Sequence, residues 1–323
     1  MSRSGALLLA CVCLAVLGAP WLAPHDPAER FPNHLYAPPM VPRVLSDGMA
    51  VPHVRPLRLV SRLERRFEAD ASAPVALEWF TRGHVVSVPA SAGTPLLLLG
   101  ADALGRDVLS RLLHAGRPSL ALALVATLGT LLLGGLLGAA AGYAGGLVDE
   151  WLSRLSDFVL VLPALYVVVV LRAVLPLVLP APAVFVLLAV IFVAVGWPVV
   201  ARGVRAIVRA ERERDYVLAS QALGATPVRV LWRHLLPAAR GHLLAQGALL
   251  LPAFILAEAT LSYVGFGFPD TTPTWGTMLQ EASSAALAGD APWLLAPAGA
   301  IFVVVLGVNL LVQGGGRPPV SFR

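Results

Sequence analysis

Long apolar runs, each long enough to cross a lipid bilayer, dominate the pattern of this chain. A transmembrane helix needs about 20 mostly apolar residues, because each residue of an α-helix rises about 1.5 Å. Six segments meet this requirement: Gly5–Leu22, Ser119–Ala141, Phe158–Leu179, Pro182–Val200, Leu243–Val264 and Ala291–Val312. Only Pro180-Ala181-Pro182 separates the third from the fourth, and its two prolines favour a tight reversal between two spans. The pattern therefore predicts an all-α integral membrane protein with six transmembrane helices.

The composition supports a membrane environment and changes how the basic charge is interpreted. Of the 323 residues, 57% are hydrophobic and 13% are charged, whereas a soluble domain carries about 25% charged residues. In such a chain, the net charge of +5 indicates basic cytoplasmic loops and not a nucleic-acid partner. Cys11 and Cys13 lie two residues apart, so a disulfide between them is not expected. The cysteines and histidines do not have metal-site spacing, and no metal is predicted.

The first apolar run has an alternative interpretation as a cleaved lipoprotein signal. Leu8-Leu9-Ala10-Cys11 resembles a lipoprotein cleavage box. However, the apolar stretch before Cys11 is only about five residues long, short of the roughly 7–15 of a signal sequence. The run also continues to Leu22. We therefore expect residues 1–22 to form an uncleaved first transmembrane helix.

The loop between the fourth and fifth spans, Ala201–His242, determines the expected orientation. Its charged residues are Arg202, Arg205, Arg209, Arg212, Arg214, Arg229, Arg233 and Arg240, against Glu211, Glu213 and Asp215. Because short loops rich in arginine stay on the cytoplasmic side, this loop is predicted to be cytoplasmic. Six spans then place both termini inside, where Arg3 and Arg317 lie near the two ends. The short loop Gly145–Asp157 is also inside by this count, although it is acidic.

The segment between the first two spans, residues 23–118, is predicted to form a small ordered cap outside the membrane. It is rich in proline and of mixed charge, with candidate short strands at Val85–Val88 and Leu96–Leu99. Asp107–Leu113 has one apolar face, which predicts an amphipathic helix at the membrane interface before the second span. The expected domains are a first span (1–22), an extracytoplasmic segment (23–118), a transmembrane core (119–312) and a cytoplasmic tail (313–323).

Helix start and stop signals predict a short helix within the loop Ala201–His242. Asp215 is a good N-cap for the run Tyr216–Leu223, and Gly224 stands where a left-handed residue ends a helix. At about 1.5 Å per residue, this helix is ~12 Å long. Its small residues and its aromatic side chain suit it to enter a groove on another protein. The alternative is a solvated basic loop that only sets the topology.

A second short helix is predicted directly after the first. Thr226-Pro227 combines an N-cap with a proline at the first helical position, and Val228–Leu236 has a helical pattern. Pro237 is expected to interrupt this run, because proline lacks the backbone N–H that a helix needs. The loop therefore contains two predicted helices at an angle around Gly224.

This loop resembles the EAA loop of ATP-binding-cassette (ABC) importer permeases. The resemblance lies in residues 215–224, D-Y-V-L-A-S-Q-A-L-G, followed by residues 233–237, R-H-L-L-P. The family pattern is E-A-A, three residues, Gly, and a Leu-Pro pair at the distance found between Gly224 and Leu236-Pro237. Here the E-A-A positions hold Leu218, Ala219 and Ser220, and His234 stands at a position that is apolar in the family.

Further motifs resemble the C-type permease of dipeptide, oligopeptide and nickel importers, and they cover most of the chain from Leu99 onward. Residues 100–111 read G-A-D-A-L-G-R-D-V-L-S-R, similar to the G-T-D-x-x-G-R-D-V-x-S-R box of that family. Residues 142–149, 258–267 and 273–279 resemble later segments of the same family.

The resemblance implies a permease subunit that forms half of the translocation pathway of an ABC importer for peptides or a similar small solute. The implied partners are a second homologous permease, two cytoplasmic ATPase subunits, an extracytoplasmic solute-binding protein and the lipid of the cell (inner) membrane. The residues expected to couple the chain to the ATPase are Asp215, Tyr216, Leu218, Ala219, Ser220, Leu223, Gly224 and Pro237. ATP and Mg are assigned to the ATPase chains, because this sequence has no lysine and so no phosphate-binding G-x-x-x-x-G-K-[S/T] loop.

Charged residues in or beside the spans are candidates for further roles. Glu258 lies in the fifth predicted span, where an ionised acid is costly, and is interpreted as structural or gating ahead of substrate binding. Arg172 in the third span is expected to reach the membrane interface with its side chain. Asp102, Arg106 and Asp107 are expected to form a turn held by local ion pairs, which add little stability where they are exposed.

Two other classes of protein compete with the importer permease. A secondary transporter driven by an ion gradient usually carries several intramembrane charges and broken helices, and here only Glu258 is a candidate. A membrane-anchored structural or receptor protein would use the outer segment 23–118. An enzyme is not predicted, since the histidines are scattered and no serine lies in a G-x-S-x-G motif.

Overall fold

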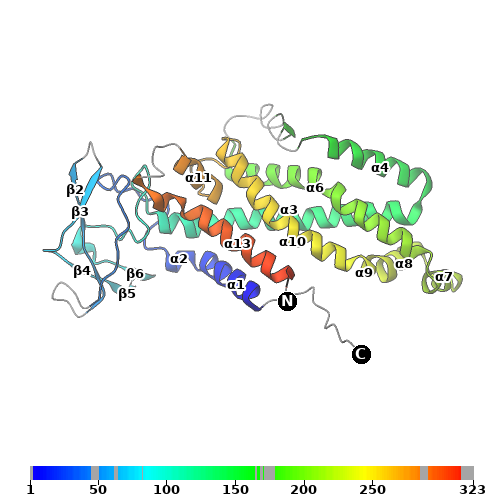
Figure 1. The fold of residues 1–323 in the computed structure, drawn as a ribbon, viewed down its shortest axis with the longest axis horizontal. Coiled ribbons are helices and arrows are strands. Elements are labelled where there is room, and N and C mark those ends of the chain that lie inside the picture. The colour runs from blue at the N-terminus through cyan, green and yellow to red at the C-terminus, as the bar shows by residue number, and fades with distance from the viewer. Residues whose placement is uncertain are drawn as a thin grey trace. The chain divides into compact units, whose positions relative to one another are not determined.

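The computed structural model describes residues 3–44, 51–61, 65–81, 83–163, 166–167, 170, 179–283 and 290–313. The chain forms two compact units, one of Met1–Ser119 with Ala259–Gly314 and the other of Leu120–Glu258 with Gly315–Arg323. In the first unit, two helices precede the short strands along the chain and further helices follow them; the second unit is helical (Figure 1).

Among the residues that the structure describes, four helical stretches are long and apolar enough to cross a membrane. They are α3 (Val108–Ala144), α6 (Ala181–Arg212), α10 (Arg240–Tyr263) and Pro292–Val312, which joins η3 (Pro292–Leu295) to α13 (Ala296–Gln313). A shorter apolar helix, α1 (Arg3–Leu17), is followed by α2 (Ala19–Leu22). These helices confirm the prediction of a mainly helical membrane protein. Most of the expected third span, Phe158–Leu179, lies outside the described residues.

The helices extend beyond the apolar runs that predicted them. Residues 108–113, expected as a separate interfacial helix, are the first turns of α3, which continues past Pro118. Asp107 caps this helix: its carboxylate accepts hydrogen bonds from the backbone N–H groups of Leu109 (3.3 Å) and Ser110 (2.9 Å). The acidic stretch Gly145–Asp157, expected as a loop, lies almost wholly within α4 (Gly146–Val161). Hydropathy located the apolar parts of these helices and missed their polar ends.

Glycines on α3 allow its backbone to lie directly against α6. A Cβ atom on Gly134 would lie 2.7 Å from the carbonyl oxygen of Trp197, and one on Gly142 would lie 2.7 Å from that of Arg205. Gly138, between them, faces the backbone of Ala201 in the same way. The residue numbers of the contacting residues increase in the same direction along both helices, so α3 and α6 run parallel. The glycines are spaced G-x-x-x-G-x-x-x-G, a pattern typical of close helix packing in membranes.

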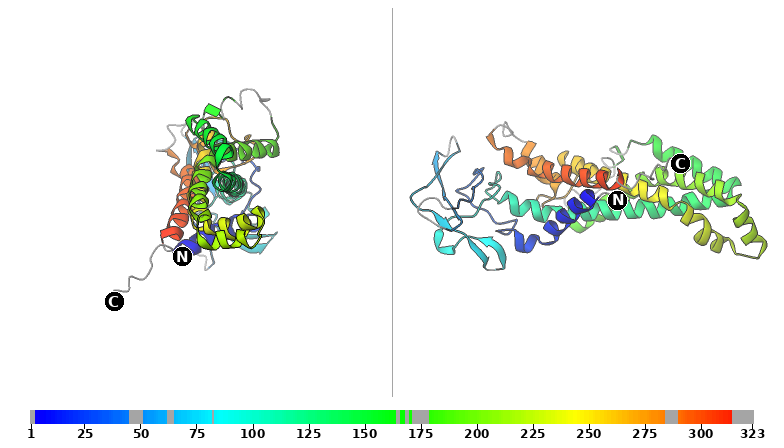
Figure 2. Two further views of the ribbon diagram at one scale, coloured as in Figure 1. Left: turned by 90° about the vertical axis from the view of Figure 1, so that its right-hand side faces the viewer. Right: turned by 60° about the horizontal axis from the view of Figure 1, so that its bottom comes forward.

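The first and last helices of the chain pack side by side (Figure 2). A Cβ on Gly5 of α1 would lie 2.5 Å from the backbone nitrogen of Leu311 in α13, and one on Gly307 would lie 3.0 Å from the Leu9 side chain. The residue numbers of the contacting residues increase along α1 and decrease along α13, so the two helices are antiparallel. The start of α1 and the end of α13 therefore lie at the same end of this helix pair.

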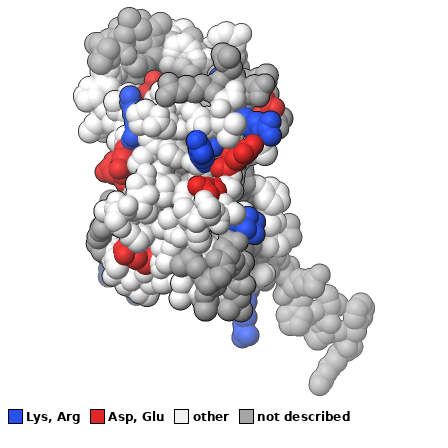
Figure 3. Space-filling model, turned by 90° about the vertical axis from the view of Figure 1, so that its left-hand side faces the viewer, with Lys and Arg blue, Asp and Glu red and all other residues white. Residues whose placement is uncertain are grey.

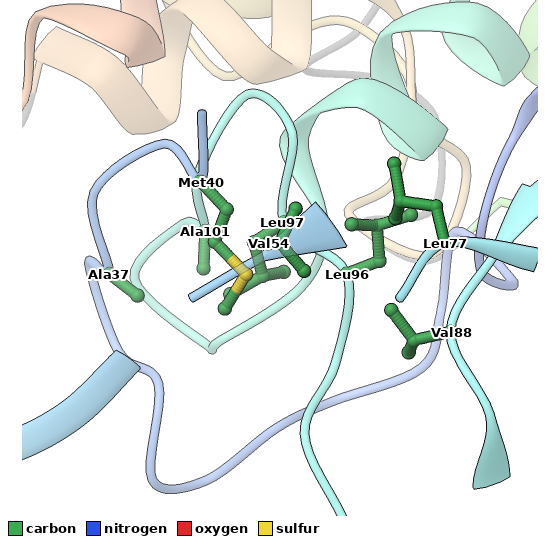
Figure 4. Packing of buried hydrophobic residues seen from close by; sticks show 8 residues of the cluster. All are labelled: Ala37, Met40, Val54, Leu77, Val88, Leu96, Leu97 and Ala101. Carbon is green, nitrogen blue, oxygen red and sulfur yellow. The ribbon is translucent and has the colours of Figure 1, made fainter. Parts of the chain in front are cut away.

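The segment between α2 and α3, called the cap here, contains three antiparallel strand pairs among its described residues and has an apolar core. The pairs are β1 (His53–Val54) with β4 (Val75–Ala76), β2 (Leu57–Ser61) with β3 (Arg66–Ala69), and β5 (Glu78–Thr81) with β6 (His84–Ser87). Figure 4 shows the buried side chains Ala37, Met40, Val54, Leu77, Val88, Leu96, Leu97 and Ala101 packed together. These side chains come from both the strand region and the segments before and after it, so they hold the cap together.

The two strands predicted in the cap had different outcomes. Val85–Val88 overlaps β6, which confirms the first strand to within one residue. Leu96–Leu99 is not a strand. Leu96 donates its backbone N–H to Nε2 of His25 at 3.0 Å, and Leu97 accepts a hydrogen bond from the backbone of Met40 at 2.8 Å. These hydrogen bonds satisfy backbone groups of the run, so Leu96 and Leu97 can be buried without belonging to a strand.

Candidate functional site

A helical hairpin joins α6 to α10 and contains most of the residues singled out by the sequence. After α6 come α7 (Asp215–Ala222), α8 (Pro227–Val230), the π-helical turn η2 (Leu231–Leu235) and α9 (Leu236–Ala238). We call residues 213–239 the helical hairpin. It contains all eight residues predicted to contact the ATPase, and all of them lie in one compact unit.

The end of α7 is formed as the sequence predicts. Gly224 has φ +83°, the left-handed conformation that glycine adopts without steric cost. Its N–H donates to the carbonyl of Gln221 at 2.9 Å, and the N–H of Ala225 donates to that of Ser220 at 3.1 Å. These two hydrogen bonds form a Schellman motif, which satisfies the last carbonyl groups of the helix.

The start of α7 differs from the prediction by one residue. Arg214 is the N-cap, and no side chain accepts a hydrogen bond there. Asp215, predicted to be the N-cap, is instead the first helical residue. In that place its carboxylate still interacts favourably with the positive end of the helix dipole.

The second helix begins as predicted but does not end at Pro237. The Thr226 hydroxyl accepts a hydrogen bond from the backbone N–H of Arg229 at 3.4 Å, which confirms the N-cap. Beyond it the helical path runs through Pro237, and a turn at Ala239 leads into α10. The prediction of an interruption at Pro237 was wrong, because the wider π-helical turn directly before it adjusts the backbone where proline offers no N–H.

The hairpin is anchored to the transmembrane helices through a buried apolar cluster. Val217 of α7 is fully buried in a cluster with residues of α3, α6, α8 and η2. The cluster consists of Ala139 of α3, Val200, Val204 and Val208 of α6, Val217, Val230, Leu235 and Ala239. A displacement of α7 is therefore transmitted to α3 and α6, because close-packed interiors pass on strain.

The opposite face of α7 presents large apolar side chains to the outside of this chain. Tyr216 is 47% exposed, Leu218 50% and Leu223 89%. Ala219 and Asp215 are also exposed, whereas Ser220 is half-buried. A short helix with one buried anchor and several exposed apolar side chains has the form of a docking element.

Tyr216 links α7 to the end of α6 and to η2. Its hydroxyl donates to Oε2 of Glu211 at 2.7 Å, and this hydrogen bond raises the pKa of Tyr216. Its ring meets that of His234 edge-on at a centroid distance of 5.7 Å. His234, which stands at an apolar position of the family pattern, thus packs against Tyr216. No sequence pattern indicates Glu211 for this role, since the contact depends on how α6 and α7 meet.

The acidic residues of α4 are paired with arginines of α6. Asp149 accepts a hydrogen bond from Nη2 of Arg205 at 2.7 Å, Arg209 lies 3.6 Å from the same carboxylate, and Asp157 pairs with Arg202. Hydrogen bonding from Arg205 lowers the pKa of Asp149. In the sequence, the acids of this stretch argued against a cytoplasmic location. The arginines of the same unit compensate for them.

The residues Asp102, Arg106 and Asp107 form the predicted turn, but their interactions are buried and reach further. Nε of Arg106 donates to Asp102 at 2.7 Å, and its Nη2 donates to Glu281 of α11 (Trp275–Ser283) at 3.0 Å. Arg111 is almost fully buried and binds both Asp102 and Glu281. A turn predicted from local pairs is thus held by a contact to a residue far along the chain.

Glu258 does not lie with the hairpin. It is almost fully buried in α10, about 27 Å along that helix from Arg240 at roughly 1.5 Å per residue. The structure therefore separates the predicted gating acid from the predicted docking residues. Arg172, the other charge predicted within a span, lies outside the described residues.

Comparison with known proteins identifies the family. Residues 134–314 match the family described as "Binding-protein-dependent transport system inner membrane component", and this match covers α6, the helical hairpin and α10. The chain belongs to this family. It is therefore a multi-pass membrane permease subunit, which confirms the predicted importer permease and not the secondary transporter. The family consists of transport components and not of enzymes.

Two curated relatives of this permease are similar over much of its length. The oligopeptide transport system permease protein OppC of Bacillus subtilis is 36% identical over 67% of this chain and 68% of its own length. The di/tripeptide transport system permease protein DppC of Pseudomonas aeruginosa is 32% identical over 96% of this chain and 84% of its own. The second match is long enough to include most of the cap.

A solved structure is also similar to this permease. It is an inward-facing conformation of the MetNI methionine ABC transporter, with a TM-score of 0.48 and 17% sequence identity. The similarity covers 64% of this chain and 96% of that one.

Proposed function

We propose that this permease forms one half of the translocation pathway of a peptide importer. The other half is a second homologous permease, an extracytoplasmic binding protein delivers the solute, and two separate cytoplasmic ATPases bind ATP and Mg. The peptide specificity follows from the oligopeptide and di/tripeptide permeases to which the chain is similar. This chain itself binds no cofactor in the proposal.

The observation that carries the proposed coupling is the two-sided nature of α7. Leu218 and Leu223 point away from the chain, while Val217 on the other side is fully buried against α6 and α3. An ATPase that closes on ATP and grips the exposed side then moves α7, and the buried side moves the helices behind it. This is a rigid-body route to alternating access.

We further propose that Leu218 makes an apolar contact with the ATPase where the family pattern carries Glu. Its side chain is half exposed and stands between the exposed Tyr216 and Leu223 in the sequence. Other residues order this hairpin, because Tyr216 bonds Glu211 and Nη1 of Arg212 donates to the carbonyl of Tyr143 at 2.8 Å. An acid at position 218 is therefore not required for that purpose.

We also propose six membrane crossings, with both termini in the cytoplasm. The antiparallel packing of α1 and α13 supports this proposal, because two antiparallel helices that both cross the membrane begin and end on the same side, which requires an even number of crossings. The described helices supply five: α1 with α2, α3, α6, α10, and η3 with α13. Parallel packing of α3 and α6 requires the chain to return across the membrane between them. The sixth crossing is therefore assigned to Phe158–Leu179.

Within this topology the proposed parts keep the boundaries expected from the sequence. The first crossing lies in residues 1–22, the extracytoplasmic cap in 23–118, the core in 119–312 and the cytoplasmic tail in 313–323. Glu258 is proposed to pair between helices or to gate the pathway, since a buried acid at this depth is costly unless it has a role.

Site-specific cross-linking tests the docking of α7. In a variant whose two native cysteines are replaced by serine, Leu223→Cys is expected to cross-link to an ATPase subunit of the assembled transporter, and ATP is expected to change the yield. The control is Leu147→Cys on α4, which is similarly exposed and lies on the same proposed side of the membrane. Equal cross-linking from both positions, or none from Leu223→Cys in an assembly that transports, contradicts the proposal.

A further inference from the structure

The β5–β6 hairpin of the cap exposes two adjacent aromatic side chains. Trp79 is 51% exposed and Phe80 is 81% exposed. Neighbouring residues of a regular strand point to opposite faces, so both are rarely exposed together on a packed sheet. Here Phe80 has φ +53°, which is unusual for a bulky residue and departs from extended backbone. The hairpin keeps a strained conformation that leaves both rings uncovered, which is a reason to look for a role.

This hairpin lies beside the end of the first apolar helix. Strand β6 packs against α2, and Nδ1 of His84 lies 2.6 Å from the carbonyl oxygen of Ala23, directly after α2. Trp21 of α2 is itself exposed. These residues all belong to one compact unit, and the contacts of β6 and His84 place the β5–β6 hairpin beside the end of α2, which carries Trp21.

The apolar surface of α1 leads toward the same place. Leu7, Leu14 and Leu17 are each about two-thirds exposed, with values between 66% and 69%, as expected for side chains that face lipid. Trp21 follows them along the chain. Trp21 thus follows a row of exposed apolar side chains that the proposed topology places in the bilayer, and the β5–β6 hairpin with Trp79 and Phe80 adjoins the end of that row.

We propose that Trp79 and Phe80, with Trp21, insert into the interfacial layer of the outer leaflet and anchor the cap to lipid. Tryptophan is enriched at membrane–water interfaces because its ring is apolar and its N–H is polar. The anchor fixes the cap at the outer end of α1. The inference rests on the proposed crossing by α1 and α2.

A protein partner on the cap, such as a solute-binding protein, is the competing occupant. On the face drawn in Figure 3, acidic and basic side chains are mixed among the uncharged ones, and the residues drawn there in colour or white form no large patch of one sign. Charge therefore gives no reason to place a protein partner at the hairpin. The continuity with α1 favours lipid.

Fluorescence from labelled cysteines tests the lipid contact. Cys11 and Cys13 are replaced by serine, Phe80→Cys is labelled with the environment-sensitive dye NBD, and the protein is reconstituted into vesicles containing spin-labelled lipid. We expect a blue-shifted emission that a spin label near the headgroup quenches several-fold more strongly than at Val60→Cys. Val60 is the matched control, since it is 53% exposed on the β2–β3 pair of the same cap. Trp79→Cys gives a second labelling position.

Each outcome separates the anchor from the topology on which it rests. Equal quenching at positions 80 and 60 overturns the anchor, and so does NBD emission at position 80 that shifts only when a binding protein is added. Labelling of Val60→Cys by a membrane-impermeant maleimide from outside intact cells tests the topology alone. If that labelling succeeds while quenching at position 80 fails, the cap is outside the membrane but is not anchored through this hairpin.

Discussion

At the scale of single residues, Gly224 carries the strictest backbone requirement in the helical hairpin. It has a positive φ and donates its N–H to Gln221, and proline permits neither. We expect Gly224→Pro to abolish ATP-coupled uptake while membrane insertion stays normal, since the local cost of about 1–3 kcal/mol falls on α7. The control is Gly241→Ala, where a Cβ atom meets nothing within 4 Å. Wild-type uptake by Gly224→Pro would exclude α7 as the coupling element.

A second residue-scale prediction concerns Asp107, whose pKa burial raises from 3.8 to about 6. An acid with a higher pKa in the folded state than in the unfolded state stabilises the protein when it is protonated. Its contribution is thus full below pH ~4 and is lost as the pH rises through 6. The two-unit shift corresponds to roughly 3 kcal/mol.

Replacing Asp107 by asparagine tests this pH dependence. Asparagine keeps an acceptor for the N-cap of α3 but carries no charge. We expect Asp107→Asn to unfold at a higher temperature than the wild type at pH 7.5, and this difference to shrink clearly at pH 4.5, measured on purified protein in detergent. Asp107→Ala loses the cap and is expected to be less stable than Asp107→Asn at both values. Wild type and Asp107→Asn with the same pH profile would show that this carboxyl does not titrate in the range.

At the scale of elements, the contact between α3 and α6 can be tested with two neighbouring glycines. Gly138 faces the backbone of Ala201, so an added methyl group must push the helices apart, at a cost of about 1–3 kcal/mol. Gly135 has its nearest neighbour, Leu243, at an ordinary 3.8 Å, and alanine there gains up to ~1 kcal/mol in helix propensity. The temperature of thermal unfolding in detergent should therefore be lower than that of the wild type in Gly138→Ala, and unchanged or higher in Gly135→Ala. The reverse order would contradict the close packing of α3 on α6.

Elements that depend on short-range chemistry were predicted well, and those that depend on distant contacts were not. Gly224 and Thr226 end and begin helices through hydrogen bonds to residues within four positions, and both predictions were confirmed. Pro237 gave an equally strong local signal, but the π-helical turn before it overrides that signal. The run Leu96–Leu99 has the composition of a strand, yet the backbone N–H of Leu96 donates to the side chain of His25, which is far away in the sequence.

At the scale of the whole molecule, the sequence predicted the membrane class and the family, because both depend on patterns that repeat along the chain. It did not predict the pairing of Asp149 with Arg205 or of Arg111 with Glu281, since nothing local indicates which distant charge compensates a given one. The first pair matters most for orientation. It explains how the acidic segment of α4 can lie beside the basic end of α6 with little free-energy penalty, because a paired charge costs less to desolvate than an isolated one.

Cysteine accessibility then tests the whole topology. In the variant without native cysteines, Val60→Cys is expected to react with a membrane-impermeant maleimide in intact cells, whereas Leu147→Cys and Leu223→Cys should react only after the membrane is permeabilised. All three side chains are well exposed, so differences in labelling report the side of the membrane and not burial. Labelling at position 147 tests the sixth crossing. Because α3 and α6 are parallel, α4, which follows α3, lies on the same side of the membrane as the end of α6. The chain must then cross the membrane once more before α6 begins at Ala181. External labelling at position 147 together with internal labelling at position 223 would rule out the six-crossing arrangement.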